Sequence, residues 1–263
     1  MQKTTKTYER RTVRNPSGKT CMLEIQRSNA GLIKVEGDKV ARLYIDAFSG
    51  PPWYEKYRVR VNGEWTRMGS PEELAALKQL QLEGRIAEKD VEPFYTVEGV
   101  KASMTAASAA DGFIISLADV PSWYTPGASG AAMGERPERR IIGASWGMAA
   151  TSVPSKEKLK GITAVIDSYS LPAQKTFYLD ETFVDIEYRG EGIGKALVEI
   201  RGSQAIESGF EYAIVRTINP VQVGNLSSVF GKENMKEAYS NPEDMQPDRR
   251  YYLIDLRGMK RHD

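Results

Sequence analysis

The sequence predicts an α/β (α+β) protein in which one mixed sheet is flanked by helices. The main evidence is the stretch 175–209. Residues 177–188 contain no Gly or Pro and are rich in aromatic and β-branched side chains, which is typical of a strand covered on both faces. Three glycines follow, and four apolar residues then repeat at helical spacing before Gly209: Ile193, Ala196, Leu197 and Ile200. Other strand and helix patterns along the chain supply the remaining elements.

The chain begins with a predicted hairpin. In residues 1–37 the strand patterns RRTVR and CMLEIQ are joined by the turn sequence NPSG, so we expect an N-terminal strand or hairpin arm. Over residues 38–48, Asp38 is a suitable N-cap for a helix with an apolar stripe of Val40, Leu43, Tyr44 and Ala47. The helix must end before SGPPWYEKY, because two prolines cannot continue it.

A second helix is well marked at residues 70–84. Ser70 is a good N-cap, Pro71 suits the first helical position, and Gly84 suits the C-terminal end. The sequence from there to about residue 110 gives no definite secondary-structure prediction.

Residues 112–119 and 139–150 are predicted to be the next two strands. The segment between them, SWYTPGASGAAMGERPE, predicts a long loop, either a lid over a ligand or a hairpin tip without function. Residues 151–173 are polar and include KEKLKG, which we interpret as a solvated excursion. Two short strands complete the pattern, at residues 211–217 and 249–258.

Composition excludes several classes of function. The chain has 36 basic and 35 acidic side chains, so its net charge of +1 gives no global attraction to nucleic acid or to an anionic membrane. No apolar run has the length of a membrane span, and the N-terminus lacks a signal peptide pattern, which predicts a cytoplasmic protein. Cys21 and His262 are single, so we expect no disulfide and no metal site, and acid–base chemistry must use carboxylates, Tyr, Lys or water.

A glycine-rich turn before a helix is chemically suited to bind an anion. Unpaired N–H groups and the helix dipole attract negative charge, and the missing side chains let a phosphate approach the backbone. A P-loop is excluded because Arg189 and Ala196 stand where it needs Gly and Ser or Thr. A dinucleotide fingerprint is excluded because Lys195 and Leu197 stand where it needs Gly. The pattern Arg-x-x-Gly-x-Gly, in contrast, is matched without a gap.

The sequence YLDETFVDIEYRGEGIGKALVE, which contains this pattern, resembles the coenzyme A motif of the GNAT superfamily of N-acetyltransferases, and within it the spermidine/spermine N-acetyltransferase type. The resemblance implies acetyl-CoA as cofactor and a mixed, mostly antiparallel sheet of about seven strands. It also implies a V-shaped splay between the fourth and fifth core strands. Residues 38–263 would form one GNAT domain, with an insertion around residues 56–110.

The resemblance also assigns roles to individual residues. The aromatic loop after the first helix would line the acceptor pocket with Trp53 and Tyr54, and the alternative is that these aromatic side chains only fill the core. The cofactor would be bound by the end of the strand, the turn, the start of the helix and a later Asn: Phe183, Val184, Arg189, Gly190, Glu191, Gly192, Ile193, Gly194, Lys195, Ala196 and Asn219.

Asp180 and Glu181 match an acidic pair that the polyamine-type enzymes carry on the same strand. Such a carboxylate either accepts a proton from the acceptor amine or holds a cationic amine. Strand alternation predicts that the two face opposite sides, Asp180 with Val184 and Glu181 with Phe183. We favour Glu181 as the base over Asp180. The competing interpretation is that both are solvated or ion-paired strand residues.

Phe230 departs from the family pattern, which commonly has a Tyr there to protonate the leaving thiolate. Either another tyrosine such as Tyr239 or Tyr251 replaces it, or the thiolate leaves unassisted, or the protein binds acyl-coenzyme A without transferring the acyl group.

The resemblance implies an N-acetyltransferase that acts on a primary amine of a small molecule or peptide. The alternatives are a non-catalytic acyl-CoA-binding regulatory module and an acetyltransferase that modifies a protein or a charged tRNA. The near-zero net charge disfavours a nucleic acid partner, no membrane partner is expected, and dimers are common in the family, which favours a homodimer.

Overall fold

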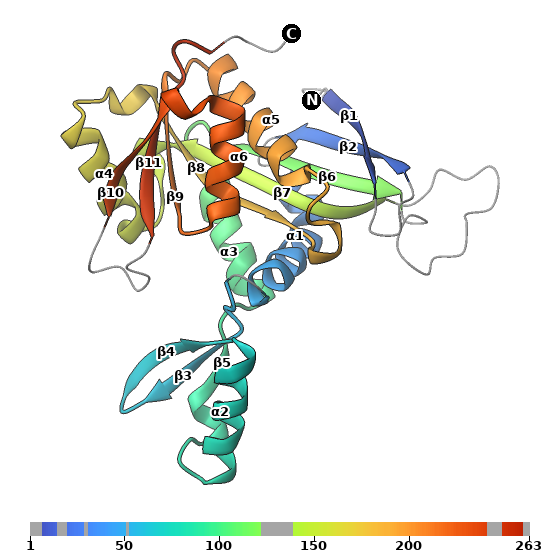
Figure 1. Cartoon of the computed structure of the whole chain (residues 1–263), viewed down its shortest axis with the longest axis vertical. Coiled ribbons are helices and arrows are strands. Elements are labelled where there is room, and N and C mark those ends of the chain that lie inside the picture. The colour runs from blue at the N-terminus through green and yellow to red at the C-terminus, as the bar shows by residue number, and fades with distance from the viewer. Residues whose placement is uncertain are drawn as a thin grey trace, which may run out of the picture.

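The computed structural model describes residues 7–14, 20–28, 31–50, 53–121, 139–240 and 249–259. Its main sheet has eight strands in the order β1-β2-β6-β7-β8-β9-β11-β10, and every neighbouring pair is antiparallel except β8 and β9 (Figure 1). The strands are β1 (Thr7–Arg14), β2 (Thr20–Ser28), β6 (Ile114–Pro121), β7 (Arg139–Ala149), β8 (Thr176–Val184), β9 (Tyr212–Thr217), β10 (Met235–Ser240) and β11 (Arg250–Asp255). The prediction of a mixed, mostly antiparallel sheet is confirmed. Of the strands in this main sheet, β10 is the one that the sequence analysis did not predict.

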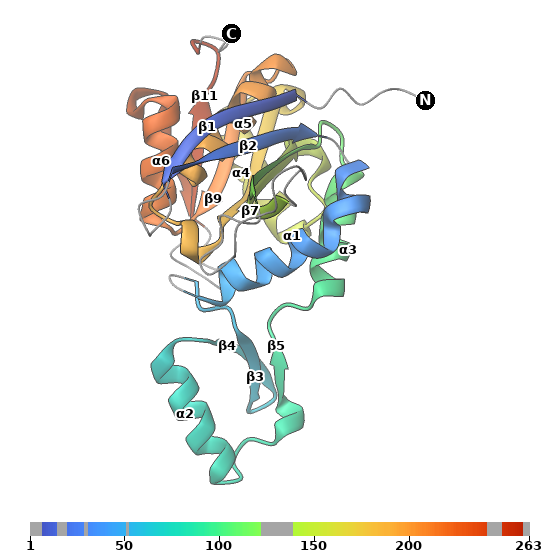
Figure 2. The same ribbon diagram turned by 90° about the vertical axis from the view of Figure 1, so that its right-hand side faces the viewer.

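Helices cover both faces of this sheet. One face packs against α1 (Gly31–Ser49), α3 (Val97–Ser108) and α4 (Lys156–Ser168), and the other against α5 (Ile193–Glu207) and α6 (Pro220–Phe230) (Figures 1 and 2). The apolar residues of β8 alternate between these two layers: Tyr178 and Phe183 lie in the α1 layer, while Phe177, Leu179 and Val184 lie in the α5 layer. This explains why the strand is apolar on both sides.

The parallel pair β8 and β9 opens along its length. Their pairing runs from Thr176 opposite Tyr212 to Leu179 opposite Val215 and then stops. β8 continues to Val184, paired beyond that point only with β7. The backbone of β8 is therefore unpaired on its β9 side from Asp180 onward, which is the predicted V-shaped splay.

A small lobe projects from the main body (Figures 1 and 2). It consists of a second sheet in the order β4-β3-β5 and one helix: β3 (Tyr57–Val61), β4 (Glu64–Met68), β5 (Val91–Pro93) and α2 (Pro71–Leu82). Asn62 and Gly63 join β3 to β4 with φ values of 53° and 87°, as a two-residue hairpin turn requires. Val59, Leu77 and Ile86 form the core of the lobe. It lies inside the stretch 56–110.

Several predicted boundaries are correct, because local signals fix them. Ser70 accepts a hydrogen bond from the Glu73 N–H while the Glu73 carboxylate accepts one from the Ser70 N–H, so a complete capping box starts α2. Gly209, with φ of 85°, follows the end of α5. β8 ends at Val184 rather than at Tyr188, since residues 186–188 form a 3₁₀ turn.

Two helices differ from the prediction. Helix α1 begins at Gly31 rather than near Asp38. Ile33, about two helical turns before Val40, extends the buried apolar stripe of the helix toward the N-terminus. Residues 156–168 form α4 instead of a solvated excursion. Ile162 and Val165 are fully buried against the sheet, and the surrounding lysines hide this narrow apolar stripe in the sequence.

Three features of the sequence analysis lie outside the described residues: the NPSG turn, the long loop of residues 122–138 interpreted as a lid or hairpin tip, and His262. Within the described ranges, no helix has both the length and the apolar character that crossing a membrane requires.

Candidate functional site

The glycine turn between β8 and α5 is open. Gly190 and Gly192 have φ values of 87° and 76°, a conformation that side-chain-bearing residues rarely adopt, and a Cβ atom at either position would meet nothing within 4 Å. Among the described residues, no side chain caps α5, and the backbone N–H groups of Ile193, Gly194 and Lys195 have no acceptor. The start of α5 therefore presents free donors to an anion.

Arg189 holds this turn in place. Its guanidinium donates to the backbone oxygen of Val184 at 3.2 Å and to that of Ala47, near the end of α1, at 2.8 Å. The arginine of the motif thus ties the turn both to the strand before it and to the opposite helical layer.

The other predicted cofactor residues fall into two groups. Ile193 and Ala196 are buried where α5 packs on the sheet, whereas Lys195 is exposed and Glu191 is half-buried beside the open turn. Asn219 is the N-cap of α6, and its side-chain oxygen accepts a hydrogen bond from the Val221 N–H at 2.9 Å.

A β-bulge decides where the carboxylates point. On β7, Trp146 lies opposite Glu181 and Gly147 lies opposite Leu179, so Asp180 is an extra residue in β8. The bulge breaks the strand alternation, and Asp180 and Glu181 turn to the same face. The prediction that the pair would face opposite sides is wrong, because simple alternation holds only in a regular strand.

Lys158 of α4 confirms this arrangement. Its Nζ donates to Asp180 Oδ1 at 2.5 Å and to Glu181 Oε1 at 3.0 Å. The indole N–H of Trp146 donates to the second Asp180 oxygen at 3.2 Å. Both Asp180 oxygens are therefore hydrogen-bonded, whereas Lys158 binds only one oxygen of Glu181.

Burial and charge shift the pKa values of this cluster. Burial raises the pKa of Glu181, and the Lys158 ammonium partly opposes that rise. Burial lowers the pKa of Lys158, but the charges of Asp180 and Glu181 outweigh it and hold that pKa well above its usual value. Lys158 is therefore a cation at neutral pH.

A buried arginine supports the bulge from the other side of the sheet. Arg201 of α5 is fully buried, and its Nη1 donates to the backbone oxygens of Trp146 at 2.5 Å and of Glu181 at 2.6 Å. Burial lowers its pKa to about 10, so the guanidinium remains charged at neutral pH. Arg201 satisfies the carbonyl groups that the irregular pairing exposes.

A cavity of about 730 Å³ opens in front of the carboxylates. It lies between the α1 layer and the region where β8 and β9 separate, and Asp180, Glu181, Lys158, Trp53 and Asn219 line it. Its wall is strongly aromatic, with Tyr44, Phe48, Trp53, Phe94, Tyr95 and Trp146. The structure thus brings together the predicted carboxylates, the predicted Trp53 and the predicted Asn219.

Tyr54, in contrast, is not among the residues that line the cavity. It has a positive φ of 50°, and a Cβ atom on Gly69 would lie 1.8 Å from its carbonyl oxygen. Tyr54 therefore belongs to the tightly packed joint between α1 and the lobe.

The sequence analysis missed several cavity residues, among them Lys158 and the buried Glu55. Glu55 is 2% exposed and accepts a hydrogen bond from the Tyr95 hydroxyl at 2.6 Å. Arg201 could have been singled out from the sequence, because it is the one charged residue in the buried stripe of α5. Lys158 could not, because it stands in a lysine-rich stretch.

Phe230 does not line the cavity. It is 2% exposed, and its ring would touch a Cβ atom placed on Gly202. Tyr251 packs against Gly161 and Tyr239 instead. The tyrosines that line the cavity are Tyr44, Tyr95 and Tyr178.

No protein-family model and no curated protein matches the sequence. Solved structures do show similarity. A protein described as an arylalkylamine N-acetyltransferase, from the yellow fever mosquito, is 11% identical with a TM-score of 0.49, covering 97% of this chain and 98% of that one. The GNAT domain of S. lividans PAT is 13% identical with a TM-score of 0.44, covering 94% and 96%. An N-acetyltransferase of Thermoplasma acidophilum in complex with coenzyme A is 12% identical with a TM-score of 0.41, covering 89% and 98%.

Proposed function

We propose that the protein is an acetyl-CoA-dependent N-acetyltransferase that acetylates a primary amine of a small molecule or peptide. One observation supports the proposal: a single strand–turn–helix unit carries backbone donors without a described acceptor at the start of α5 and a half-buried carboxylate pair on β8. An acyl carrier with a diphosphate needs the first feature, and an amine acceptor that loses a proton needs the second.

The residues of the turn fit the diphosphate of coenzyme A. The missing side chains of Gly190 and Gly192 leave space, and the N–H groups of Ile193, Gly194 and Lys195 supply donors without an acceptor in the described part of the chain. The unpaired edge of β8 beyond Leu179 offers backbone groups to the pantetheine arm. When bound, acetyl-CoA supplies an acetyl group activated as a thioester.

Glu181 is the preferred base. The acceptor nitrogen gains the acetyl group and loses a proton. That proton goes to the Glu181 oxygen that Lys158 does not bind and that has no hydrogen-bond partner among the described residues. Asp180 is less suited, because Lys158 and Trp146 already occupy both of its oxygens. The C–S bond of the thioester breaks, and the thiolate leaves unassisted and takes one proton from solvent. Tyr178 lines the cavity but is a poor proton donor, because burial raises its pKa above the usual value.

Thiol release from acetyl-CoA in the presence of an amine panel tests the function directly. The panel contains polyamines, arylalkylamines, amino acids, aminoglycosides and lysine peptides. Acceptor-dependent release supports the proposal. Binding of acetyl-CoA without release for any acceptor would support the non-catalytic acyl-CoA-binding module instead, and absence of binding would rule out both.

Gly194→Asp should weaken acetyl-CoA binding by roughly tenfold or more, because it places a carboxylate at the proposed diphosphate site. Its Cβ atom would lie 3.5 Å from Asn225 and 3.8 Å from Val184, which are ordinary contacts, so the variant should fold. Calorimetric titration with acetyl-CoA measures the change. Gly258→Asp, where a Cβ atom would meet nothing within 4 Å, is the control. Unchanged binding of acetyl-CoA by Gly194→Asp would place the diphosphate elsewhere.

Lys158→Met should shift the acid limb of the pH–rate profile to higher pH. The Lys158 ammonium lowers the pKa of Glu181, so its removal raises that pKa further. A base with a higher pKa is protonated, and thus inactive, up to a higher pH. The profile of kcat/KM against pH measures the shift, with Lys156→Met as the control because Lys156 is an exposed residue of the same helix. An unchanged acid limb would show that Glu181 is not the titrating base.

A further inference from the structure

The outer face of the β4-β3-β5 sheet carries three arginines and a tryptophan. Arg58 lies opposite Arg67, and Arg60 lies opposite Trp65. The alternate residues of β3 point the other way, into the core of the lobe with Leu77. We call this surface, formed by Arg58, Arg60, Trp65 and Arg67, the arginine face.

The positive charge of the arginine face exceeds the negative charge of the carboxylates that pair with it. The Arg58 and Arg60 guanidinium carbons lie 5.1 Å and 4.7 Å from the centre of the Trp65 ring. Arg58 pairs with Glu92 at 2.6 Å, and Arg67 lies 3.8 Å from Glu55. Arg60 is exposed and makes no ion pair with any residue of the described ranges. Like charges on directly opposed strand residues are destabilising, so an anionic partner would relieve this surface.

This face is continuous with the cavity. Arg58, Pro93 and Phe94 line the cavity, and Arg60 lies two residues further along β3, about 7 Å away at the usual strand rise. An acceptor whose amine reaches Glu181 and whose remainder leaves the cavity past Arg58 would meet the arginine face.

The charges inside the cavity do not favour a polycation. At the bulge, Asp180 and Glu181 form ion pairs with Lys158, and the buried Arg201 adds a second positive charge that interacts with both carboxylates. Of the ionised side chains that line the cavity, four are basic and three are acidic: Arg58, Lys158, Arg216 and Arg249 against Glu55, Asp180 and Glu181. A polyamine would find no surplus of negative charge here, despite the resemblance of β8 to polyamine enzymes.

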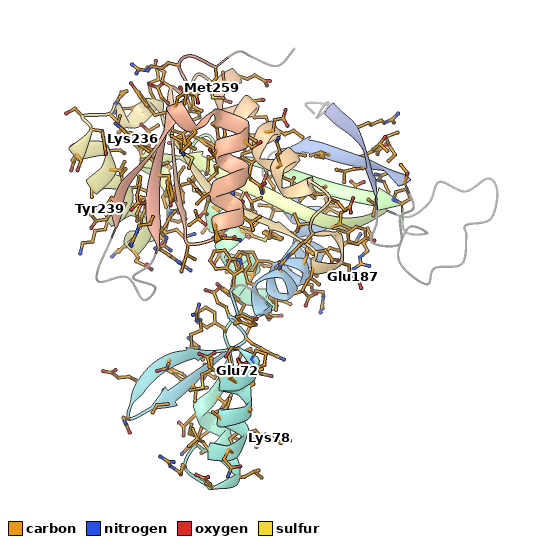
Figure 3. All side chains as sticks on the ribbon, viewed as in Figure 1. Glu72, Lys78, Glu187, Lys236, Tyr239 and Met259 are labelled. Carbon is orange, nitrogen blue, oxygen red and sulfur yellow. The ribbon has the colours of Figure 1, made fainter. Side chains whose placement is uncertain are left out.

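From these observations, and resting on the proposed function, we infer that the acceptor is an amine carried by an acidic polypeptide segment, whose carboxylates bind the arginine face. The planar guanidinium group of arginine can donate two parallel hydrogen bonds to one carboxylate. A polypeptide is favoured over a nucleic acid because the chain has a net charge of only +1 and the other side of the lobe, helix α2, begins with Glu72 and Glu73 (Figure 3).

Peptides with one central lysine flanked by Glu, Ser or Arg test this inference. The acidic peptide should have the lowest KM, and added salt should raise that KM more than the KM of the neutral peptide. Arg60→Gln should raise the KM of the acidic peptide by about tenfold and leave the KM of the neutral peptide and of acetyl-CoA unchanged. Lys78→Gln is the matched control, because it removes an exposed cation from helix α2 of the same lobe (Figure 3).

Fluorescence anisotropy with the labelled acidic peptide separates this inference from the proposed function. Binding that Arg60→Gln weakens and Lys78→Gln does not would support the arginine face even if no lysine were acetylated. Equal KM values for the three peptides would overturn the inference, and so would an Arg60→Gln variant with the same KM for the acidic peptide as the native protein. Thiol release with other amines would still support the proposed function in either case. A single-stranded oligonucleotide that competes at lower concentration than the acidic peptide would also overturn it, in favour of a nucleic acid.

Discussion

Glu181→Gln should lower kcat by roughly 100-fold to 10,000-fold, the range for loss of a general base, with little change in acetyl-CoA affinity. The amide keeps the size of the side chain and still accepts a hydrogen bond from Lys158, which lies 3.0 Å from Glu181 Oε1 in the native protein. It cannot accept the proton of the acceptor amine. Because Glu181 points into the cavity and not toward the glycine turn, diphosphate binding should be unaffected. Stopped-flow thiol release and calorimetry measure the two quantities separately.

Asp180→Asn provides the matched comparison. The Trp146 indole and Lys158 both donate hydrogen bonds to the Asp180 carboxylate. Loss of that carboxylate charge should disturb the position of the cluster, and it should reduce kcat less than Glu181→Gln does. Only Glu181→Gln should abolish the acid limb of the pH–rate profile. If Asp180→Asn abolishes it and Glu181→Gln does not, the assignment of the base is reversed. Loss of acetyl-CoA binding in either variant would show a structural role instead.

Gly147→Ala should destabilise the protein by about 3 kcal/mol, the upper end of the usual cost of overpacking a core. Gly147 lies on β7 opposite Leu179, beside the bulge, and a Cβ atom there would lie 2.4 Å from the Tyr178 carbonyl oxygen and 2.5 Å from the Phe177 ring. Neither the backbone of a central strand nor a fully buried ring can yield easily. Urea denaturation measures the free energy of unfolding, and the melting temperature should fall by roughly 10 °C.

Gly224→Ala is the control for that experiment. Gly224 is an exposed residue of α6, and a Cβ atom there meets nothing within 4 Å, so alanine should stabilise the helix by about 0.5 to 1 kcal/mol. Unchanged stability of Gly147→Ala would contradict the close packing of β7 against β8 that positions the carboxylates.

Residues 175–209 were predictable because their signals are local. The positive φ values of Gly190, Gly192 and Gly209 need glycine whatever the rest of the chain does, and the apolar stripe of α5 repeats within a few turns. The capping box at Ser70 is equally local. The anion site at the start of α5 was therefore readable from the sequence as a candidate.

The composition of the cavity was not readable in the same way. Its residues come from α1, the lobe, α3, β7, α4, β8, β9, α6 and the segment before β11, and no sequence spacing links them. Lys158 was hidden in a lysine-rich stretch, although it contacts the two carboxylates more closely than any predicted residue. Tyr54 was assigned to the pocket because it neighbours Trp53, whereas its backbone conformation places it in the joint with Gly69.

By itself, the sequence determined the order of the elements around the central strand, the open turn after Tyr188 and the presence of two adjacent carboxylates before it. Tertiary structure alone decided that both carboxylates face one cavity. That outcome depends on the pairing of β8 with β7, where one extra residue makes a bulge, and on Arg201 and Lys158, which arrive from opposite sides of the sheet to satisfy the carbonyl and carboxylate oxygens there. Strand register and contacts between distant helices are cooperative properties of the folded chain, so no local pattern encodes them.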